Sequence, residues 1–232
     1  MNGIVSRGLA LAVGIAALFG QTDAKAQYEL GLRYEQAKDF AQAAAWYGKA
    51  AAQGNANAQY NLAVMNAKGR GMAVNPGKAA EWYQRAAAQG LAHAQYNLAV
   101  LHLNGEGVAK NPALAEQLLL KAAAQGLDSA QYNLGALYES GRVLSKDLAK
   151  AAQYYRGAAE QGDSAAQLRL AMMCANGDGV ARDFVAAYMW AELAATGGNK
   201  DAASLRTELT AAMKPDRIAE AKRRAKEWKP KR

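Results

Sequence analysis

Few residues in this chain could carry out covalent chemistry at neutral pH: one cysteine, Cys174, and two histidines, His93 and His102. A histidine activates a cysteine only when the two side chains lie about 3 Å apart. His102 and Cys174 are separated by two periods of a 36-residue repeat. Because packed helices lie about 8–10 Å apart, we expect these side chains to be on the order of 20 Å apart. The sequence therefore predicts no Cys–His nucleophile.

Other catalytic motifs are also missing from the sequence. There is no Gly-x-Ser-x-Gly elbow and no metal-ligand spacing. Gly-x-Gly loops such as 69–71 and 105–107 could suggest phosphate binding, but they follow helical segments, recur along the chain and lack the Lys-Ser/Thr of a P-loop. We interpret them as turns, and we expect no enzyme activity, no metal and no cofactor.

A seven-residue sequence, AQYNLAV, occurs at 58–64 and again at 94–100, with the variants AQYNLGA at 130–136 and AQLRLAM at 166–172. Five sets of positions follow the same period: Tyr60, Tyr96, Tyr132 and Leu168; Gly69, Gly105, Gly141 and Gly177; Gly54, Gly90, Gly126, Gly162 and Gly198; Trp46, Trp82, Leu118, Tyr154 and Trp190; Asp39, Asn75, Asn111, Asp147 and Asp183. Each set is called a column below. Five columns that share one period identify an internal repeat.

Each column has a physical reason. Asp and Asn are good helix N-caps, and Pro76 and Pro112 follow two of them at the favoured first helical position. Glycines such as Gly90 are typical of the left-handed residue that ends a helix. Each repeat is thus predicted to be two helices, and neighbouring pairs must stack to bury their apolar faces. The expected fold is all-α: an α-solenoid of about five helix-turn-helix repeats with a C-terminal capping helix.

The segment YNLAVLHLNGEGVAKNPALAEQLLLKAAAQG resembles a Sel1-like repeat, and WYQRAAAQG is similar to the second-helix signature of that family. The resemblance covers about five repeats between Gln27 and Gly198, and the segment AASLRTELTAAMKPDRIAEAKRRAKEW looks like the helical cap of some bacterial members. It implies an adaptor or scaffold for protein assemblies. A cysteine-rich, disulfide-bonded branch of the family has been linked to β-lactam binding, and this chain lacks paired cysteines, so that function is not implied.

Two departures from the repeat pattern stand out. Val143 replaces the second loop glycine in the fourth repeat, and Leu168-Arg169 replaces Tyr-Asn in the fifth. Cys174 lies among apolar neighbours (AMMCA), which predicts a buried, inert thiol, with an intermolecular disulfide as the alternative.

A stripe of residues on the first helix of each repeat is left over once the core positions are assigned. These residues lie one, four and eight positions after the tyrosine column and share one helix face. They are Asn61, Val64 and Lys68; Asn97, Val100 and Asn104; Asn133, Ala136 and Ser140; Arg169, Met172 and Asn176. A ladder of asparagines could hold the backbone of an extended peptide on a concave face. Alternatively, Asn61, Asn97 and Asn133 bridge neighbouring repeats or the loop backbone.

The positive charge is concentrated at the C-terminal end. The whole chain carries +8, and residues 214–232 contain nine Lys or Arg and three Asp or Glu, a net charge of +6. Ile218, Ala221, Ala225 and Trp228 fall at helical spacing, which indicates a capping helix. The alternative is a patch for anionic lipid or cell-wall polymer, formed by Lys222, Arg223, Arg224 and Lys226.

The first 26 residues resemble a cleavable export signal. Arg7 precedes an apolar run, LALAVGIAALFG, which is too short to span a membrane, and Ala24-Lys25-Ala26 supplies a cleavage pattern. Alternatives are an uncleaved anchor and a buried helix. Cleavage after Ala26 predicts a periplasmic protein, with secretion as the alternative. The expected organisation is a signal peptide at 1–26, a repeat solenoid at 27–198 and a helical cap with a basic tail at 199–232.

These observations predict a non-enzymatic scaffold or adaptor of the bacterial envelope that binds another protein or peptide through the concave stripe. Nucleic acid is not an expected partner, because no aromatic residues are interleaved with the basic ones. The alternative function is peripheral contact with an anionic envelope polymer or membrane surface through the basic tail.

Overall fold

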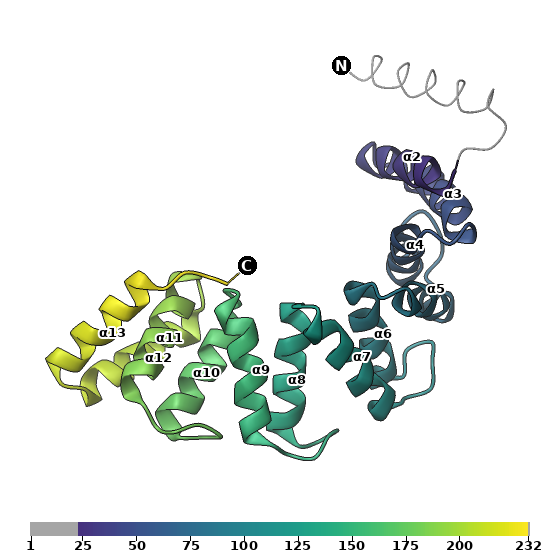
Figure 1. The fold of residues 1–232 in the computed structure, drawn as a ribbon. Helices are drawn as coiled ribbons and strands as arrows, with labels where there is room; N and C mark the ends of the chain where they lie inside the picture. Colours follow the sequence, from purple (N-terminus) through teal and green to yellow (C-terminus); the bar gives the residue numbers. More distant parts are fainter. Residues whose placement is uncertain (1–22, 232) are drawn as a thin grey trace, which may run out of the picture. The chain divides into compact units, whose positions relative to one another are not determined.

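The computed structural model describes residues 23–231, where the chain forms twelve helices and no strand (Figure 1). The first helices of the repeats are α2 (Ala24–Gln36), α4 (Ala56–Lys68), α6 (Ala92–Asn104), α8 (Asp128–Ser140) and α10 (Ser164–Asn176). The second helices are α3 (Phe40–Ala52), α5 (Pro76–Ala88), α7 (Pro112–Ala124), α9 (Leu148–Glu160) and α11 (Phe184–Thr196). Two more helices follow, α12 (Lys200–Ala212) and α13 (Pro215–Glu227).

The helices belong to two compact units, Met1–Lys110 and Asn111–Arg232, here called the first and second unit. Within each unit, the two helices of a repeat pack against each other and against the helices of the adjoining repeat. The prediction of an all-α fold made of helix pairs is confirmed: in α2–α3, α4–α5, α8–α9 and α10–α11, each pair buries apolar faces that neither helix could bury alone.

The predicted caps are confirmed. The side chains of Asp39, Asn75, Asn111, Asp147 and Asp183 each accept a hydrogen bond from a backbone N–H in the first turn of the helix that follows. Gly90 closes α5 with a φ of 89°, in the left-handed region, and its counterparts in the other repeats do the same. Local capping chemistry therefore fixes where each second helix begins and ends.

The second glycine of the Gly-x-Gly loop is needed for close approach. A Cβ on Gly179 would lie 2.1 Å from the carbonyl oxygen of Leu148, at the start of the preceding second helix, and a Cβ on Gly71 would meet Phe40 in the same way. In the fourth repeat, where Val143 replaces this glycine, the loop borders a cavity of about 460 Å³.

The column that begins with Trp46 is unevenly buried. Leu118 and Trp190 are buried, whereas Trp46, Trp82 and Tyr154 are only half-buried. The following column is more deeply buried: Tyr47 and Tyr155 are fully enclosed, and Leu119 takes the same position. Lys49 and Arg85 lie over the rings of Trp46 and Trp82, at 3.9 and 4.6 Å from the ring centroids. The half-buried indoles therefore carry a charged neighbour on one face, which a core position would not allow.

Glutamines link the helix pairs in a way that the sequence analysis did not consider. The amide nitrogens of Gln59, Gln95, Gln131 and Gln167 donate to the carbonyls of Ala51, Ala87, Ala123 and Ala159 in the preceding second helix. Gln89 Nε2 also donates to Gln59 Oε1 at 2.8 Å, and Gln161 donates to Gln131 in the same way. These bonds satisfy polar groups at the junction between repeats.

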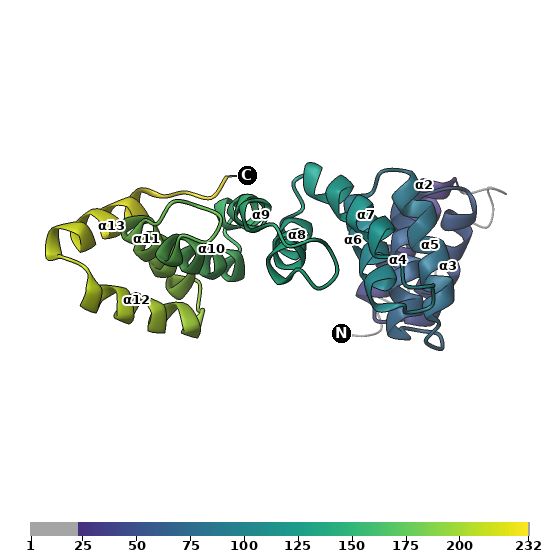
Figure 2. The same ribbon diagram turned by 90° about the horizontal axis from the view of Figure 1, so that it is seen from below.

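The C-terminal cap contains two helices rather than the single one expected. Both α12 and α13 pack against α11 (Figure 2). On α13, Ala221 and Ala225 are buried, and Trp228 meets Trp190 edge-on at 6.2 Å between ring centroids. The amphipathic pattern of this helix therefore serves to cover the end of the last repeat.

None of the helices between residues 23 and 231 is both long and apolar enough to cross a membrane. The apolar run of the predicted signal peptide lies outside the described residues. The predicted cleavage point after Ala26 falls in the first turn of α2, where Asp23 accepts a hydrogen bond from the Ala26 N–H.

Candidate functional site

In the first unit, the predicted stripe lies on α4 and α6, and its asparagines have partners within the unit. Asn61 forms side-chain hydrogen bonds with Tyr28 and Tyr47, and Asn97 forms one with Tyr83. Val64 and Val100 are half-buried, and Lys68 is exposed. Asn104 donates to Glu106 Oε1 at 2.8 Å. The scaffold interpretation gains support at Asn61 and Asn97, and partner binding by the stripe stays a prediction.

In the second unit, the stripe continues on α8 and α10. Ser140 donates to the carbonyl of Leu137, and Asn176 donates to Asp178 in the following loop. Asn133 and Ala136 are half-buried. Met172 is 40% exposed, which makes it one of the few large apolar side chains in the described residues that face solvent.

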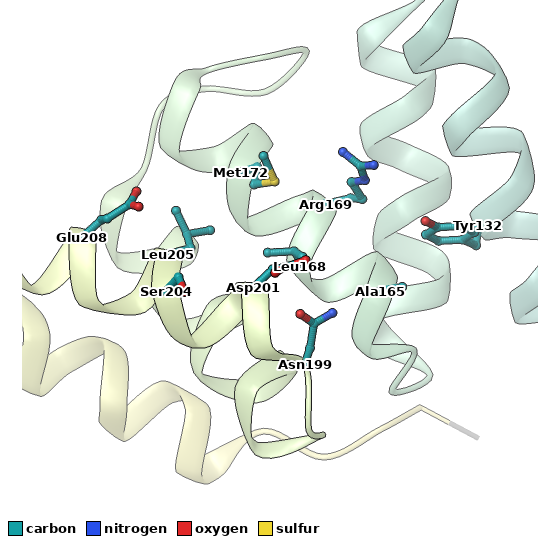
Figure 3. A pocket seen from close by; sticks show the side chains of 10 residues that line it. All are labelled: Tyr132, Ala165, Leu168, Arg169, Met172, Asn199, Asp201, Ser204, Leu205 and Glu208. Atoms are coloured by element: carbon teal, nitrogen blue, oxygen red, sulfur yellow. The ribbon is translucent and has the colours of Figure 1, made fainter.

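A groove of about 560 Å³ lies over α8, α10 and the following α12 (Figure 3). Leu168, Arg169 and Met172 come from α10, and Tyr132 comes from α8. The α12 side is formed by Asp201, Ser204, Leu205 and Glu208, with Asn199 just before the helix. Apolar side chains therefore line a groove with acidic groups along one side.

The α12 residues were missed by the sequence analysis, although the repeat period was the signal that could have found them. Leu205 and Glu208 lie 36 residues after Arg169 and Met172, so they occupy the stripe positions of a sixth first helix. This segment was predicted to be part of the cap, so the repeat columns were not extended into it. Two successive copies of the same stripe thus contribute to the lining of the groove.

The groove is lined by one cationic and two acidic side chains. Burial alone would lower the pKa of Arg169. Attraction to Glu139 and a side-chain hydrogen bond with Tyr132 outweigh the effect of burial, so the pKa of Arg169 is raised. Asp201 and Glu208 are exposed on the opposite side and make no ion pair with the described residues. The charged residues that line the groove, Arg169, Asp201 and Glu208, therefore carry a net formal charge of −1.

The predicted basic tail lies on the exposed face of α13. Arg223 donates to both carboxylate oxygens of Glu227, at 2.9 and 3.1 Å, and Arg224 pairs with Glu220. Lys222 and Lys226 are exposed and form no ion pair with residues 23–231. Two of the four predicted patch residues are therefore partly neutralised by acids on the same helix.

The three residues considered for covalent chemistry, Cys174, His93 and His102, pack against or hydrogen-bond to parts of the scaffold. Cys174 is buried, and burial raises the pKa of its thiol, so the expectation of a buried cysteine is confirmed. His102 Nδ1 lies 3.1 Å from the carbonyl oxygen of Ala109, and the His93 ring meets Tyr60 edge-on. Among the described residues, no group of three or more His, Cys, Asp or Glu side chains could hold a metal ion.

Successive helix pairs with a shared period, and a groove made of repeated positions, define a helical-repeat protein. The Sel1 repeat model matches residues 24–55, 56–91, 92–127, 128–163 and 164–199, so the chain belongs to the Sel1 repeat family. A comparison with curated proteins found no match.

The similar solved structures include the following three. A protective antigen present in uropathogenic Escherichia coli strains, with an SLR fold, is 35% identical with a TM-score of 0.80, over 92% of this chain and 46% of that one. A Sel1 repeat protein from Oxalobacter formigenes is 32% identical with a TM-score of 0.73, and the match covers 90% of this chain and 88% of that one. A Sel1 repeat protein from Klebsiella pneumoniae is 26% identical with a TM-score of 0.52, over 81% and 93%. The chain thus spans about half the length of the Escherichia coli protein.

Sel1 repeat proteins generally act as protein–protein interaction modules and form a family of repeat scaffolds that are generally non-catalytic.

Proposed function

We propose that this protein is a non-enzymatic interaction scaffold that binds an extended segment of a partner protein in the groove over α8, α10 and α12. The observation that carries the proposal is the exposed Met172 within a groove of about 560 Å³. An exposed large apolar side chain in a concave site is a common anchor point for a partner. The mechanism is presentation of a preformed surface, with no bond made or broken.

The chemistry of the groove specifies the partner segment. Leu168, Met172 and Leu205 favour an apolar side chain, which would lose its contact with water on binding. Asp201 and Glu208 favour a Lys or Arg next to that side chain, because their carboxylates have no cationic partner among residues 23–231. The preferred ligand is therefore a peptide segment with an apolar residue beside a basic one.

We further propose that the protein acts in the bacterial envelope, as an exported adaptor. The support is the signal-like pattern of the first 26 residues. Fractionation of cells that produce the tagged chain tests this location: a mature start at Gln27 in the periplasmic fraction is expected, and a full-length cytoplasmic chain would contradict it.

The groove is tested with peptides of defined sequence. A random nine-residue peptide library is selected on the immobilised protein, and an enriched peptide is then titrated by calorimetry against Met172→Asp and against Asp201→Asn/Glu208→Gln. Leu120→Asp on α7 is the matched control, because Leu120 is 36% exposed and lies outside the groove.

We expect enriched peptides to place Lys or Arg next to Leu, Met or Phe, with affinity at least tenfold weaker for both groove variants and unchanged for the control. Equal weakening by Leu120→Asp, or enrichment without basic residues, would contradict the proposal. Binding that is lost only when Lys222 and Lys226 are changed to Gln would instead support a surface-binding role for the basic tail.

A further inference from the structure

A second cavity in the second unit, of about 480 Å³, lies between the loop that precedes α11 and the turn that joins α12 to α13. It shares no lining residue with the groove over α10 and α12. Three cationic side chains border it: Arg182 from the loop, and Lys214 and Arg217 from the start of α13. Segments about 30 residues apart in the sequence thus bring three positive charges to one cavity.

The acid that lines this cavity does not neutralise the three cations. Asp183 is the N-cap of α11, and its Oδ1 atom accepts hydrogen bonds from the N–H groups of Val185 and Ala186, at 2.9 and 3.1 Å. A carboxylate held by two backbone donors at a helix N-terminus is already stabilised there. The cavity therefore keeps an excess of positive charge.

Two of the three cations are held in place by neighbouring side chains. The Arg182 guanidinium lies 4.5 Å from the centroid of the Phe184 ring, which restricts its orientation. Arg217 lies 3.5 Å from Glu220, and Glu220 also pairs with Arg224 on its other side. One carboxylate shared by two guanidinium groups leaves charge available to a ligand.

The start of α13 adds to the positive potential. The N-cap residue, Lys214, provides no side-chain hydrogen bond to the first turn, and Pro215 occupies the first helical position. Elsewhere in the second unit, Asn111, Asp147 and Asp183 place a capping oxygen at this point of a helix. The positive end of the α13 dipole therefore lacks a capping side chain, with Asp216 in the first turn offsetting part of it, and it lies next to Lys214 and Arg217.

We propose that this cavity is a binding site for a phosphate monoester. Two guanidinium groups and one ammonium suit a group that carries close to two negative charges and several acceptor oxygens, and they suit a singly charged carboxylate less well. The cavity is larger than a phosphoryl group alone requires, and the Phe184 ring and the half-buried Met213 form apolar walls. The ligand is thus an organic phosphate whose apolar or aromatic part rests on these walls.

Phenyl phosphate and inorganic phosphate are the probes, titrated by calorimetry into the full chain at constant ionic strength. The site variant is Arg182→Gln/Lys214→Gln. The matched control is Lys222→Gln/Lys226→Gln, which removes the same charge from exposed positions of α13 outside the cavity. Thermal unfolding of each variant verifies that it is folded.

We expect saturable binding of phenyl phosphate, at least tenfold weaker for the site variant and within twofold of wild type for the control. Inorganic phosphate should bind more weakly than phenyl phosphate, because it cannot contact Phe184. Equal weakening by the control variant would show a non-specific charge effect and overturn the proposal.

Vesicles that contain phosphatidic acid, a lipid with a phosphate monoester headgroup, distinguish a soluble ligand from a lipid headgroup. We expect phenyl phosphate to bind in the absence of vesicles. If the vesicles bind the chain, phenyl phosphate does not, and the control variant is the one that loses vesicle binding, then an anionic surface is recognised by the exposed tail and the cavity proposal is wrong.

Discussion

The hydroxyl of Tyr155 on α9 donates a 2.6 Å hydrogen bond to Oε2 of Glu139 on α8. A bond of the same length joins Tyr47 to Glu35 in the first unit. Each ring also packs against a glycine, Gly135 or Gly31, of the partner helix. In the second repeat, Ala63 takes the glycine position and Ala67 takes the glutamate position. Tyr83 there has Asn97 as its hydrogen-bond partner instead. Glycine, tyrosine and glutamate therefore form one packing arrangement that recurs in two repeats.

Tyr155→Phe removes the donor to Glu139 while keeping the buried ring. Since hydrogen bonds to charged groups contribute about 1.5–3 kcal/mol, we expect a loss of that size in the free energy of unfolding, measured by urea denaturation. Tyr154→Phe is the control, because the Tyr154 ring is half-buried and stacks on Tyr138. A similar loss in both variants would show that the Glu139 bond adds nothing specific.

Gly135→Ala should destabilise the second unit, because the new Cβ would lie 2.7 Å from the Tyr155 ring. Overpacking of this kind costs about 1–3 kcal/mol. Gly48→Ala is the matched control: it is also helical, nothing lies within 4 Å of its added Cβ, and helix propensity favours alanine by up to about 1 kcal/mol. Thermal unfolding should thus shift in opposite directions, and two shifts of the same sign would refute the steric argument.

Gln59→Ala tests the glutamine column. Gln59 is buried, donates to the Ala51 carbonyl at 3.1 Å and accepts from Gln89 at 2.8 Å. The substitution removes one of the two donors to the Ala51 carbonyl, which keeps the Gly54 N–H at 3.0 Å, so we expect a loss of about 0.5–1.5 kcal/mol in urea denaturation. The exposed Gln84 on α5 provides the comparison, and Gln84→Ala should change stability by less than about 0.5 kcal/mol. If Gln59→Ala and Gln84→Ala changed stability equally, the buried glutamines would not contribute specifically to stability.

The buried tyrosines predict alkaline unfolding. Burial, together with hydrogen-bonded carboxylates, raises the pKa of Tyr47, Tyr138 and Tyr155 above the ordinary value of 10.0. The native state then binds more protons than the unfolded state above about pH 10, so stability is fully present below that pH and falls as pH rises beyond it. Absorbance at 295 nm, followed with circular dichroism, should show these tyrosines ionising together with the loss of helix. Ionisation of all eleven tyrosines near pH 10 with helix retained would disprove this.

Trp228→Ala tests the cap. Trp228 meets Trp190 of α11 edge-on, and Lys231 pairs with Glu160 beyond it at 2.7 Å. Since Trp228 is half-buried, we expect a loss of about 1–3 kcal/mol, at or below the lower end of the range for a fully buried tryptophan. Lys229→Ala on the exposed side should be nearly neutral in the same thermal scan. A neutral Trp228→Ala would mean that α13 contributes little to the second unit.

The features that the sequence predicted well depend on neighbouring residues. Asn75 caps α5 through a backbone N–H three residues away, and Gly90 closes the same helix by its own left-handed conformation. Such chemistry acts within one turn, so residue type and spacing were sufficient. The 36-residue period then required that each helix pair pack like the others, and the family match agrees with that expectation.

What the sequence could not settle depends on which side chains meet across helices. Adjacent aromatic residues, such as Trp46 and Tyr47, look equally suited to a core, and only the packed helices show that Tyr47 is enclosed while Trp46 lies half-buried beneath Lys49. The groove likewise required α12 to pack beside α10, which brings Glu208 near Met172 although they are 36 residues apart. The sequence by itself determined the repeats, their caps and the location of charge, because these are local or periodic. The tertiary structure decided the core, the groove and the cationic cavity, because each depends on contacts between helices that no single segment encodes.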